Sequence, residues 1–292
     1  MYLTGFADDA ADGMDGQIRA TQELGWTHIE SRAVNKKNLV DVSEADFNEV
    51  CRNVERAGIQ INCFGSAIAN WSKQITDPFD ITLEEIARAI PRMKRLGAKL
   101  IRIMSYAVLK NGDCDADDQM EQERFRRLRE ILKRFMGEGL LPVHENCMNY
   151  GGMGWSYTQK MLENVPGLKL IFDTGNPVFT DDRTKSRPYP KQSSWEFYTH
   201  VKDRIAYVHI KDGFWDQGEN KAVYTFPGEG QAAVERIVKD LLDNGYDGGF
   251  SMEPHLAVVF HDADVKSDDA VRYANYVEYG RRFMKLLKKI GH

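Results

Sequence analysis

Four short apolar stretches in the second half of the chain each end in residues that can carry acid–base or metal chemistry. These endings read His144-Glu145-Asn146, Asp173-Thr174-Gly175-Asn176, His209-Ile210-Lys211-Asp212 and Glu253-Pro254-His255. If the stretches are strands, their side chains alternate between two faces. One face of each strand can then present an ionisable group, and the four groups expected to converge are Glu145, Asp173, His209 and Glu253.

Convergence of three carboxylates needs a counter-charge, because like charges repel and raise one another's pKa. A divalent cation supplies it, and three oxygen donors with one imidazole suit Mn²⁺. Mg²⁺, Co²⁺, Fe²⁺ and Zn²⁺ remain alternatives, since ligand type alone does not choose among them. A single aspartate at a strand end is more often a turn or cap residue, and a single histidine a hydrogen-bonding partner. Four such residues at successive strand ends instead predict a site for one divalent metal ion.

The four endings belong to a longer pattern of eight apolar stretches, each followed by a helix-like segment. The predicted strands are residues 2–8, 28–31, 59–65, 99–106, 140–146, 168–176, 205–212 and 248–254. The predicted helices are residues 14–25, 43–58, 81–97, 121–139, 155–165, 193–203, 232–245 and 266–289. Repeated β–α alternation argues for a parallel sheet, and eight units argue for a closed (β/α)₈ barrel with its active site at the C-terminal ends of the strands. We expect one barrel domain over residues 1–292. A doubly wound open sheet is the alternative, but the GxGxxG signature of its dinucleotide-binding forms is absent.

The composition argues against several classes of protein. The chain has 292 residues and a formal net charge of −5, whereas the footprint of a nucleic-acid partner is usually basic. No apolar stretch reaches the length of about 18 residues that suggests a membrane span, and the start MYLTGFADDAADG lacks the layout of a signal peptide. Four scattered cysteines form neither a disulfide framework nor a CxxC zinc site. We expect a cytoplasmic protein with a small carbohydrate as its partner, as a monomer or a homo-oligomer.

Taken in order, five motifs resemble the xylose-isomerase-like TIM barrels of the sugar-phosphate isomerase/epimerase superfamily. They are VHEN (143–146), FDTGN (172–176), YVHIKD (207–212), PGEG (227–230) and MEP (252–254). The resemblance covers most of the chain. It implies that Glu145, Asp173, His209 and Glu253 bind Mn²⁺ or a similar ion. It also implies that Glu145 and Glu253 are catalytic and exchange protons on opposite faces of a cis-enediolate.

This chemistry predicts a metal-dependent sugar isomerase or epimerase that acts through a metal-bound enediolate on a ketose, keto-polyol or 3-keto-sugar. Chelation of the carbonyl and a neighbouring hydroxyl acidifies the adjacent C–H, and carboxylates on either face can remove and return the proton. Return on the other face inverts a centre, whereas return to the neighbouring carbon interconverts aldose and ketose. The alternative is a lyase or dehydratase that uses the same site on a 3-keto-glycoside or an inosose-type substrate.

Two positions depart from the ketose 3-epimerases that the sequence resembles. Those enzymes have a histidine three residues after the strand-six aspartate, where this chain has Asn176. They also have an arginine several residues after the strand-seven histidine, where this chain has only lysines. A standard ketose 3-epimerase is therefore not expected. His144 resembles the catalytic histidine that precedes the strand-five glutamate in enzymes acting on 3-keto-glycosides. We treat it as a catalytic candidate, with packing on the opposite strand face as the alternative.

Further residues near the strand ends are candidates for contact with substrate, and they are Lys211, His255, Asn176, Glu30 and Trp155. Each also has a structural alternative. Lys211 can pair with a neighbouring carboxylate, and Glu30 can either orient a metal ligand or pair with Arg32 or Arg102. Trp155 can cover a loop or contact another subunit as readily as it can stack on a sugar.

Two other classes of function are disfavoured. An apurinic-site endonuclease on this type of barrel needs several zinc ions, more histidines and a basic surface for phosphate. This chain has seven histidines and a net charge of −5. A non-catalytic barrel that binds sugar or metal has no specific residue in its favour.

Overall fold

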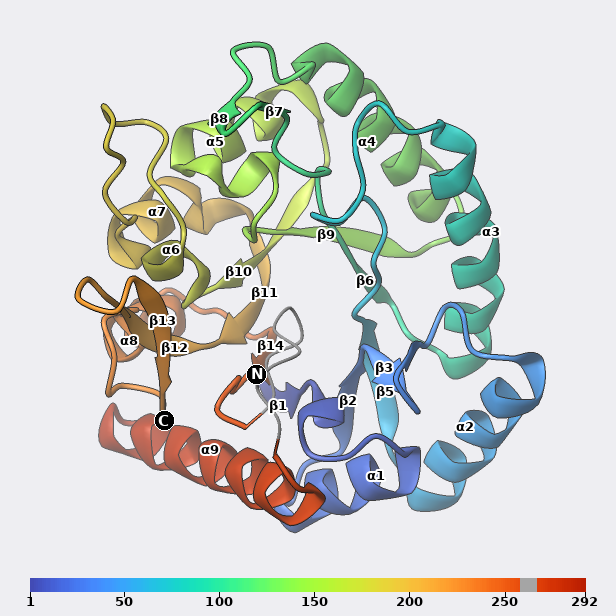
Figure 1. Ribbon diagram of the computed structural model, residues 1–292. Helices are drawn as coiled ribbons and strands as arrows, with labels where there is room; N and C mark the ends of the chain where they lie inside the picture. Colours follow the sequence, from blue (N-terminus) through green and yellow to red (C-terminus); the bar gives the residue numbers. More distant parts are fainter. Residues whose placement is uncertain (258–266) are drawn as a thin grey trace.

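Eight parallel strands form a barrel with helices on its outside (Figure 1). The computed structural model describes residues 1–257 and 267–292. In spatial order the strands are β1 (Tyr2–Gly5), β14 (Gly249–Met252), β11 (Ile205–Ile210), β10 (Lys169–Asp173), β9 (Leu141–Glu145), β6 (Leu100–Ile103), β5 (Gln60–Phe64) and β2 (His28–Ser31). A parallel bridge between Phe6 and Glu30 brings the last strand back to the first, so the sheet closes. The predicted (β/α)₈ barrel is confirmed.

Each barrel strand is followed along the chain by an outer helix. These helices are α1 (Met14–Glu23), α2 (Glu44–Ala57), α3 (Phe79–Leu96), α4 (Glu121–Met136), α5 (Trp155–Asn164), α7 (Ser194–Val201), α8 (Val234–Asp243) and α9 (Asp269–Lys289). Helix α2 is capped at both ends, because Ser43 accepts from the Asp46 amide and Gly58 ends the helix at a φ of 66°. The start predicted for the last helix, residue 266, lies outside the described residues. Across residues 1–257 and 267–292, no helix combines the length and apolar character that crossing a membrane requires.

The two faces of the barrel strands bury different residues, as strand alternation predicts. Val208 and Ile210 of β11 belong to the large apolar cluster between the strands and the helices. Tyr207 on the same strand and Ile171 on β10 belong to a small cluster inside the barrel. The inner faces therefore lead up to Asp173 and His209, which are paired in register at the ends of their strands.

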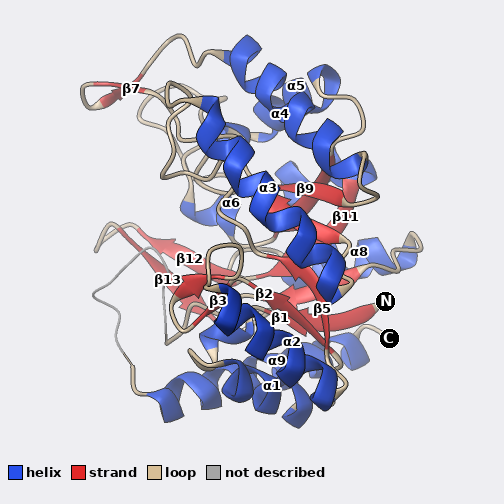
Figure 2. Cartoon of the chain, turned by 90° about the vertical axis from the view of Figure 1, so that its right-hand side faces the viewer, coloured by secondary structure: helices blue, strands red, loops and turns tan. Residues whose placement is uncertain are grey.

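Short elements that the sequence did not predict are inserted into the loops between the barrel units. They are the hairpins β3 (Ala33–Val34) with β4 (Lys37–Asn38), β7 (Lys110–Asn111) with β8 (Cys114–Asp115) and β12 (Asp212–Asp216) with β13 (Lys221–Thr225), the helix α6 (Asn176–Phe179), and the 3₁₀ turns η1 (Ala7–Asp9), η2 (Tyr150–Met153) and η3 (Lys202–Arg204). In Figure 2, β7, β12 and β13 project at the end of the barrel opposite the two termini. The segment 177–194, which lies between a predicted strand and a predicted helix, begins within α6 and carries a bridge between Asp181 and Lys191.

Asp212 explains why the glycine-rich PGEG motif follows the β12–β13 hairpin. Its buried carboxylate accepts hydrogen bonds from the amides of Gly213 at 2.8 Å, Gly228 at 2.8 Å, Gly230 at 3.2 Å and Ala232 at 3.0 Å. A Cβ at Gly230 would lie 2.3 Å from Asp212 Oδ1, so only glycine allows this approach. The motif thus closes the base of the hairpin beside Lys211.

Candidate active site

The four side chains expected to converge do lie together at the C-terminal end of the barrel. Glu145, Asp173 and His209 stand at the ends of β9, β10 and β11, and Glu253 directly follows β14. One ligand atom from each lies within 4.8 Å of the others, and all four residues are buried. The arrangement follows from register, because Asp173 pairs with His209 across β10 and β11.

His209 is held by hydrogen-bonding groups on both sides of its ring. Nε2 lies 3.0 Å from Glu30 Oε2, which also accepts a 2.6 Å hydrogen bond from Ser251. Nδ1 faces the cluster, 3.4 Å from Glu145 Oε1, 3.4 Å from Glu253 Oε2 and 4.0 Å from Asp173 Oδ2. Of the two alternatives for Glu30, orientation of a ligand matches this geometry. A carboxylate behind a ligating imidazole fixes its tautomer and ring orientation.

The cluster has the donor set that a divalent cation requires. His209 Nδ1, Asp173 Oδ2 and Glu253 Oε2 are buried and lack a hydrogen-bond donor among the described residues. Buried polar atoms normally have a partner, and here the two oxygens face the Lys211 ammonium, at 3.0 Å each, and the imidazole of His209. Three carboxylates and one imidazole fit Mn²⁺, Mg²⁺ or a similar ion, and they do not distinguish among them.

Lys211 and Asn176 connect the cluster to the space above it. Lys211 Nζ donates to Asn176 Oδ1 at 3.1 Å, and Asn176 Nδ2 donates to Glu145 Oε1 at 3.3 Å. Burial alone would lower the pKa of Lys211, but Asp173 and Glu253 hold it well above the ordinary value. The lysine is therefore held as an ammonium group in contact with Asp173 and Glu253.

Two buried arginines, which the sequence suggested only as partners of Glu30, each pair with one of the two glutamates Glu145 and Glu253. Arg102 Nη1 lies 3.0 Å from Glu145 Oε2, and Arg32 Nη1 lies 3.4 Å from Glu253 Oε1. Both guanidinium groups also lie over the Phe6 ring, at 4.3 Å for Arg32 and 5.2 Å for Arg102. Burial alone would raise the pKa of Glu145, but Arg102 and then His209 lower it to about 2. Both glutamates are thus placed as carboxylates.

His255 contacts Glu253, whereas His144 and Trp155 lie away from the cluster. His255 adopts a φ of 52° and places Nε2 3.1 Å from Glu253 Oε1. His144 is fully buried on the other face of β9, with Nε2 3.0 Å from Ser105 Oγ, and burial lowers its pKa to about 4. Trp155 stacks on His200 with ring centroids 3.8 Å apart. This geometry favours packing for His144 and gives no support to a substrate contact for Trp155.

A cavity of about 260 Å³, the mouth cavity, lies directly over the site. Its lining includes both glutamates, both arginines and the three predicted contact residues Asn176, Lys211 and His255, together with Tyr224, Cys147 and Trp71. Each described cation that lines it is paired with a carboxylate, including Lys36, which lies 3.5 Å from Asp12. An anionic ligand would compete with these ion pairs, whereas an uncharged ligand would not.

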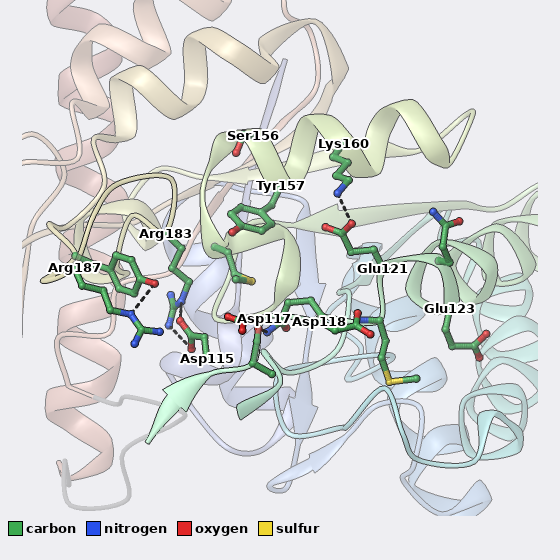
Figure 3. A pocket seen from close by; sticks show the side chains of 16 residues that line it. Asp115, Asp117, Asp118, Glu121, Glu123, Ser156, Tyr157, Lys160, Arg183 and Arg187 are labelled. Carbon is green, nitrogen blue, oxygen red and sulfur yellow. Dashed lines mark hydrogen bonds and ion pairs between the residues drawn. The ribbon is translucent and has the colours of Figure 1, made fainter. Parts of the chain in front are cut away.

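A larger hollow of about 870 Å³ lies to the side, between the start of α4, helix α5 and the loop around Arg187 (Figure 3). One wall is acidic and the other basic, and the two are joined by the ion pairs Lys160–Glu121 and Arg183–Asp115. Among the described residues, the acidic groups of this hollow do not form a metal-binding set, whereas the barrel-mouth cluster does. In the part of the chain that the structure describes, the candidate metal ligands therefore lie at the barrel mouth.

The chain belongs to the family of xylose isomerase-like TIM barrels, because the model of that family matches residues 18–275. The resemblance inferred from the five motifs is thereby confirmed. The fold and the cluster at the strand ends define the class of protein, which contains both epimerases and dehydratases.

Three relatives illustrate this range. An inosose dehydratase from Clostridium perfringens (strain 13 / Type A) is 23% identical over 307 residues, covering 91% of this chain and 95% of that protein. A xylose isomerase-like TIM barrel protein from Mycobacterium smegmatis, solved in complex with magnesium, has a TM-score of 0.70 and 17% identity, with 99% of this chain and 97% of that chain covered. The 3-keto-D-glucoside 4-epimerase of E. coli has a TM-score of 0.63 and 16% identity, with 97% and 99% covered. At these identities the structural likeness is one of fold.

Proposed function

We propose that the protein is a metal-dependent enzyme that transfers a proton at the carbon next to the carbonyl of a keto-sugar or keto-polyol, as an isomerase or epimerase. The observation that carries this proposal is the placement of two ionised glutamates, Glu145 and Glu253, in one buried donor set beneath the mouth cavity. A divalent cation held by Glu145, Asp173, His209 and Glu253 would polarise the substrate carbonyl and acidify the neighbouring C–H.

Each glutamate has the charge state that a base needs. The pKa of Glu145 is about 2, because Arg102 and His209 outweigh the effect of burial. Burial would likewise raise the pKa of Glu253, but Lys211 and His209 hold it well below the ordinary value. A carboxylate on each face of a bound substrate can take a proton from one side while the other returns it.

Lys211 and Asn176 would bind the oxygen atoms of the substrate. Their amide and ammonium groups face each other at 3.1 Å beside the two glutamates. A substrate hydroxyl placed beside this pair can accept a hydrogen bond from Lys211 Nζ and donate one to Asn176 Oδ1, which orients the C–H towards a carboxylate.

A dehydratase acting on an inosose-type keto-polyol is the second candidate. It is favoured by Lys211, a buried ammonium that can protonate a departing hydroxyl, and by the similarity to inosose dehydratase over most of both chains. In that reaction a glutamate removes the C–H proton, the electron pair of the bond forms the carbon–carbon double bond, and the β-hydroxyl leaves as water with a proton from Lys211.

Proton exchange tests the step that both candidates share. Protein loaded with Mn²⁺ is incubated in D₂O with ketoses, inososes and 3-keto-glycosides, and NMR follows deuterium incorporation and new olefinic signals. Deuterium at one carbon with a retained skeleton is expected for an isomerase or epimerase. An unsaturated product is expected for a dehydratase.

Glu145→Gln and Glu253→Gln are expected to abolish the exchange. Glu229→Gln is the matched control, because Glu229 pairs with Arg282 at the surface and lies outside the mouth cavity. Absence of exchange with every compound, while bound Mn²⁺ is verified by elemental analysis, would refute the proposal.

A further inference from the structure

A second hollow of about 340 Å³ adjoins the mouth cavity on its outer side. The two hollows share part of their lining, namely Trp71, Met148, Phe179 and Thr180. We call this second hollow the outer hollow. The mouth cavity alone is smaller than the roughly 300–1,000 Å³ typical of sites for drug-sized ligands, whereas the two together fall within that range. The joined space is therefore large enough for a ligand with two parts.

The shared wall is apolar and open to solvent. Trp71 is 37% exposed and Met148 is 43% exposed, although most other large apolar side chains of the described residues are buried. Phe179 continues the wall inward, because its ring centroid lies 4.9 Å from that of Tyr224, which lines the mouth cavity. An apolar surface at the rim of a polar pocket commonly marks a binding site.

Among the described residues, each cation that lines the outer hollow is held in an ion pair, although Lys110 and Arg183 share the one carboxylate of Asp115. Lys191 Nζ lies 2.8 Å from Asp181 Oδ1, and Lys110 and Arg183 both pair with Asp115. Figure 3 shows the Arg183–Asp115 pair in the neighbouring side hollow, and Arg183 lines both spaces. A phosphate or carboxylate would have to break these pairs, whereas an uncharged ring would not.

We propose that the outer hollow is a subsite for the non-reacting part of the substrate, and that this part is the uncharged aromatic or sugar aglycone of a 3-keto-glycoside. The inference rests on the proposed function, because it places the reacting keto-sugar ring in the mouth cavity. Trp71 and Met148 form the platform on which the aglycone lies. Contacts of this remote part then contribute binding free energy and hold the reacting ring against the glutamates.

The test compares methyl and phenyl 3-keto-β-glucosides, which share the reacting ring and differ only in the aglycone. Deuterium exchange is measured with Mn²⁺-loaded protein in D₂O. The phenyl compound is expected to have a KM about tenfold lower than the methyl compound. Trp71→Ala and Met148→Ala are expected to reduce this preference to about threefold or less. Trp195→Ala, a matched tryptophan on α7 beneath Arg236, is expected to retain it.

Equal KM values for the two compounds in the wild type, or a full preference in both wall variants, would overturn the subsite. Exchange with the methyl compound would then leave the proposed function intact. Saturation-transfer NMR with unoxidised phenyl β-glucoside needs no turnover. It therefore separates failure of the subsite from failure of the proposed function. Transfer to the phenyl protons that is lost in Trp71→Ala supports the subsite even without exchange, and absence of transfer at millimolar concentration refutes it.

Discussion

Glu30 and His209 come from β2 and β11, which are not neighbours in the barrel, yet 3.0 Å separates Oε2 of the glutamate from Nε2 of the imidazole. Ser251 donates to the same carboxylate oxygen at 2.6 Å, so Glu30 is itself held in place. The imidazole of His209 is therefore fixed in an orientation that points Nδ1 at the three carboxylates. Metal affinity should therefore depend on a residue that does not reach the metal position.

Glu30→Gln is expected to weaken Mn²⁺ binding by roughly 10- to 100-fold, the usual effect of losing the partner of a ligating histidine. Isothermal titration of chelator-treated protein measures the dissociation constant directly. Glu235→Gln changes a surface glutamate paired with Lys289 and is the matched control. An unchanged dissociation constant in Glu30→Gln would show that Glu30 does not orient His209.

Arg102→Met is expected to destabilise the metal-free protein by about 3–5 kcal/mol, because it leaves the buried Glu145 carboxylate uncompensated. Adding Glu145→Gln removes that charge and is expected to recover roughly 1–3 kcal/mol. Urea unfolding of the wild type, both single variants and the double variant gives the four free energies of unfolding of a double-mutant cycle. Additive losses would mean that the two side chains do not interact.

The buried His144 predicts a loss of stability on the acid side. Burial lowers its pKa from 6.5 to about 4, so the unfolded chain binds a proton below pH 6.5 while the folded chain does not. Stability from this group is complete above pH 6.5 and falls as the pH drops towards 4, by up to ~3 kcal/mol. Thermal unfolding from pH 4.5 to 7.5 measures this effect, and the melting temperature should depend less steeply on pH in His144→Gln than in the wild type. His292→Gln, at the exposed chain end, is the control, and parallel slopes in the wild type and His144→Gln would contradict the prediction.

Asp212→Ala is expected to destabilise the protein by at least about 2 kcal/mol, because buried amides that lose their acceptor each cost roughly 1–3 kcal/mol. Asp212→Asn keeps one acceptor oxygen and should have an intermediate effect. Limited proteolysis should detect earlier cleavage in the β12–β13 hairpin. Asp243→Ala, on the surface of α8, controls for loss of an aspartate, and equal stability of the two alanine variants would argue against the role of Asp212.

The barrel and the ligand cluster were predictable because they depend on local patterns. Alternation along β11 separates Val208 from His209, and the β–α order brings the strand ends to one edge. Caps such as Ser43 and Gly58 likewise mark helix ends within a few residues of sequence.

The arginine pairs and the hairpins were not predictable for the opposite reason. Arg102 reaches Glu145 because β6 pairs with β9 in a particular register, with Arg102 opposite Val143, and nothing in either strand alone determines that stagger. The β12–β13 hairpin depends on amides far along the chain that turn back to Asp212. Such contacts exist only once the barrel has closed.

The bridge between Phe6 and Glu30 gives that closure a further consequence. The backbone of Glu30 completes the ring of strands, and its side chain anchors His209. A fluctuation that parts the β1–β2 seam and displaces Glu30 would also release the imidazole, so an ion bound in the cluster would resist that opening by mass action. Amide hydrogens along this seam should accordingly exchange with solvent more slowly in the metal-loaded protein. The ion would then stabilise the closed ring of strands as well as take part in the chemistry.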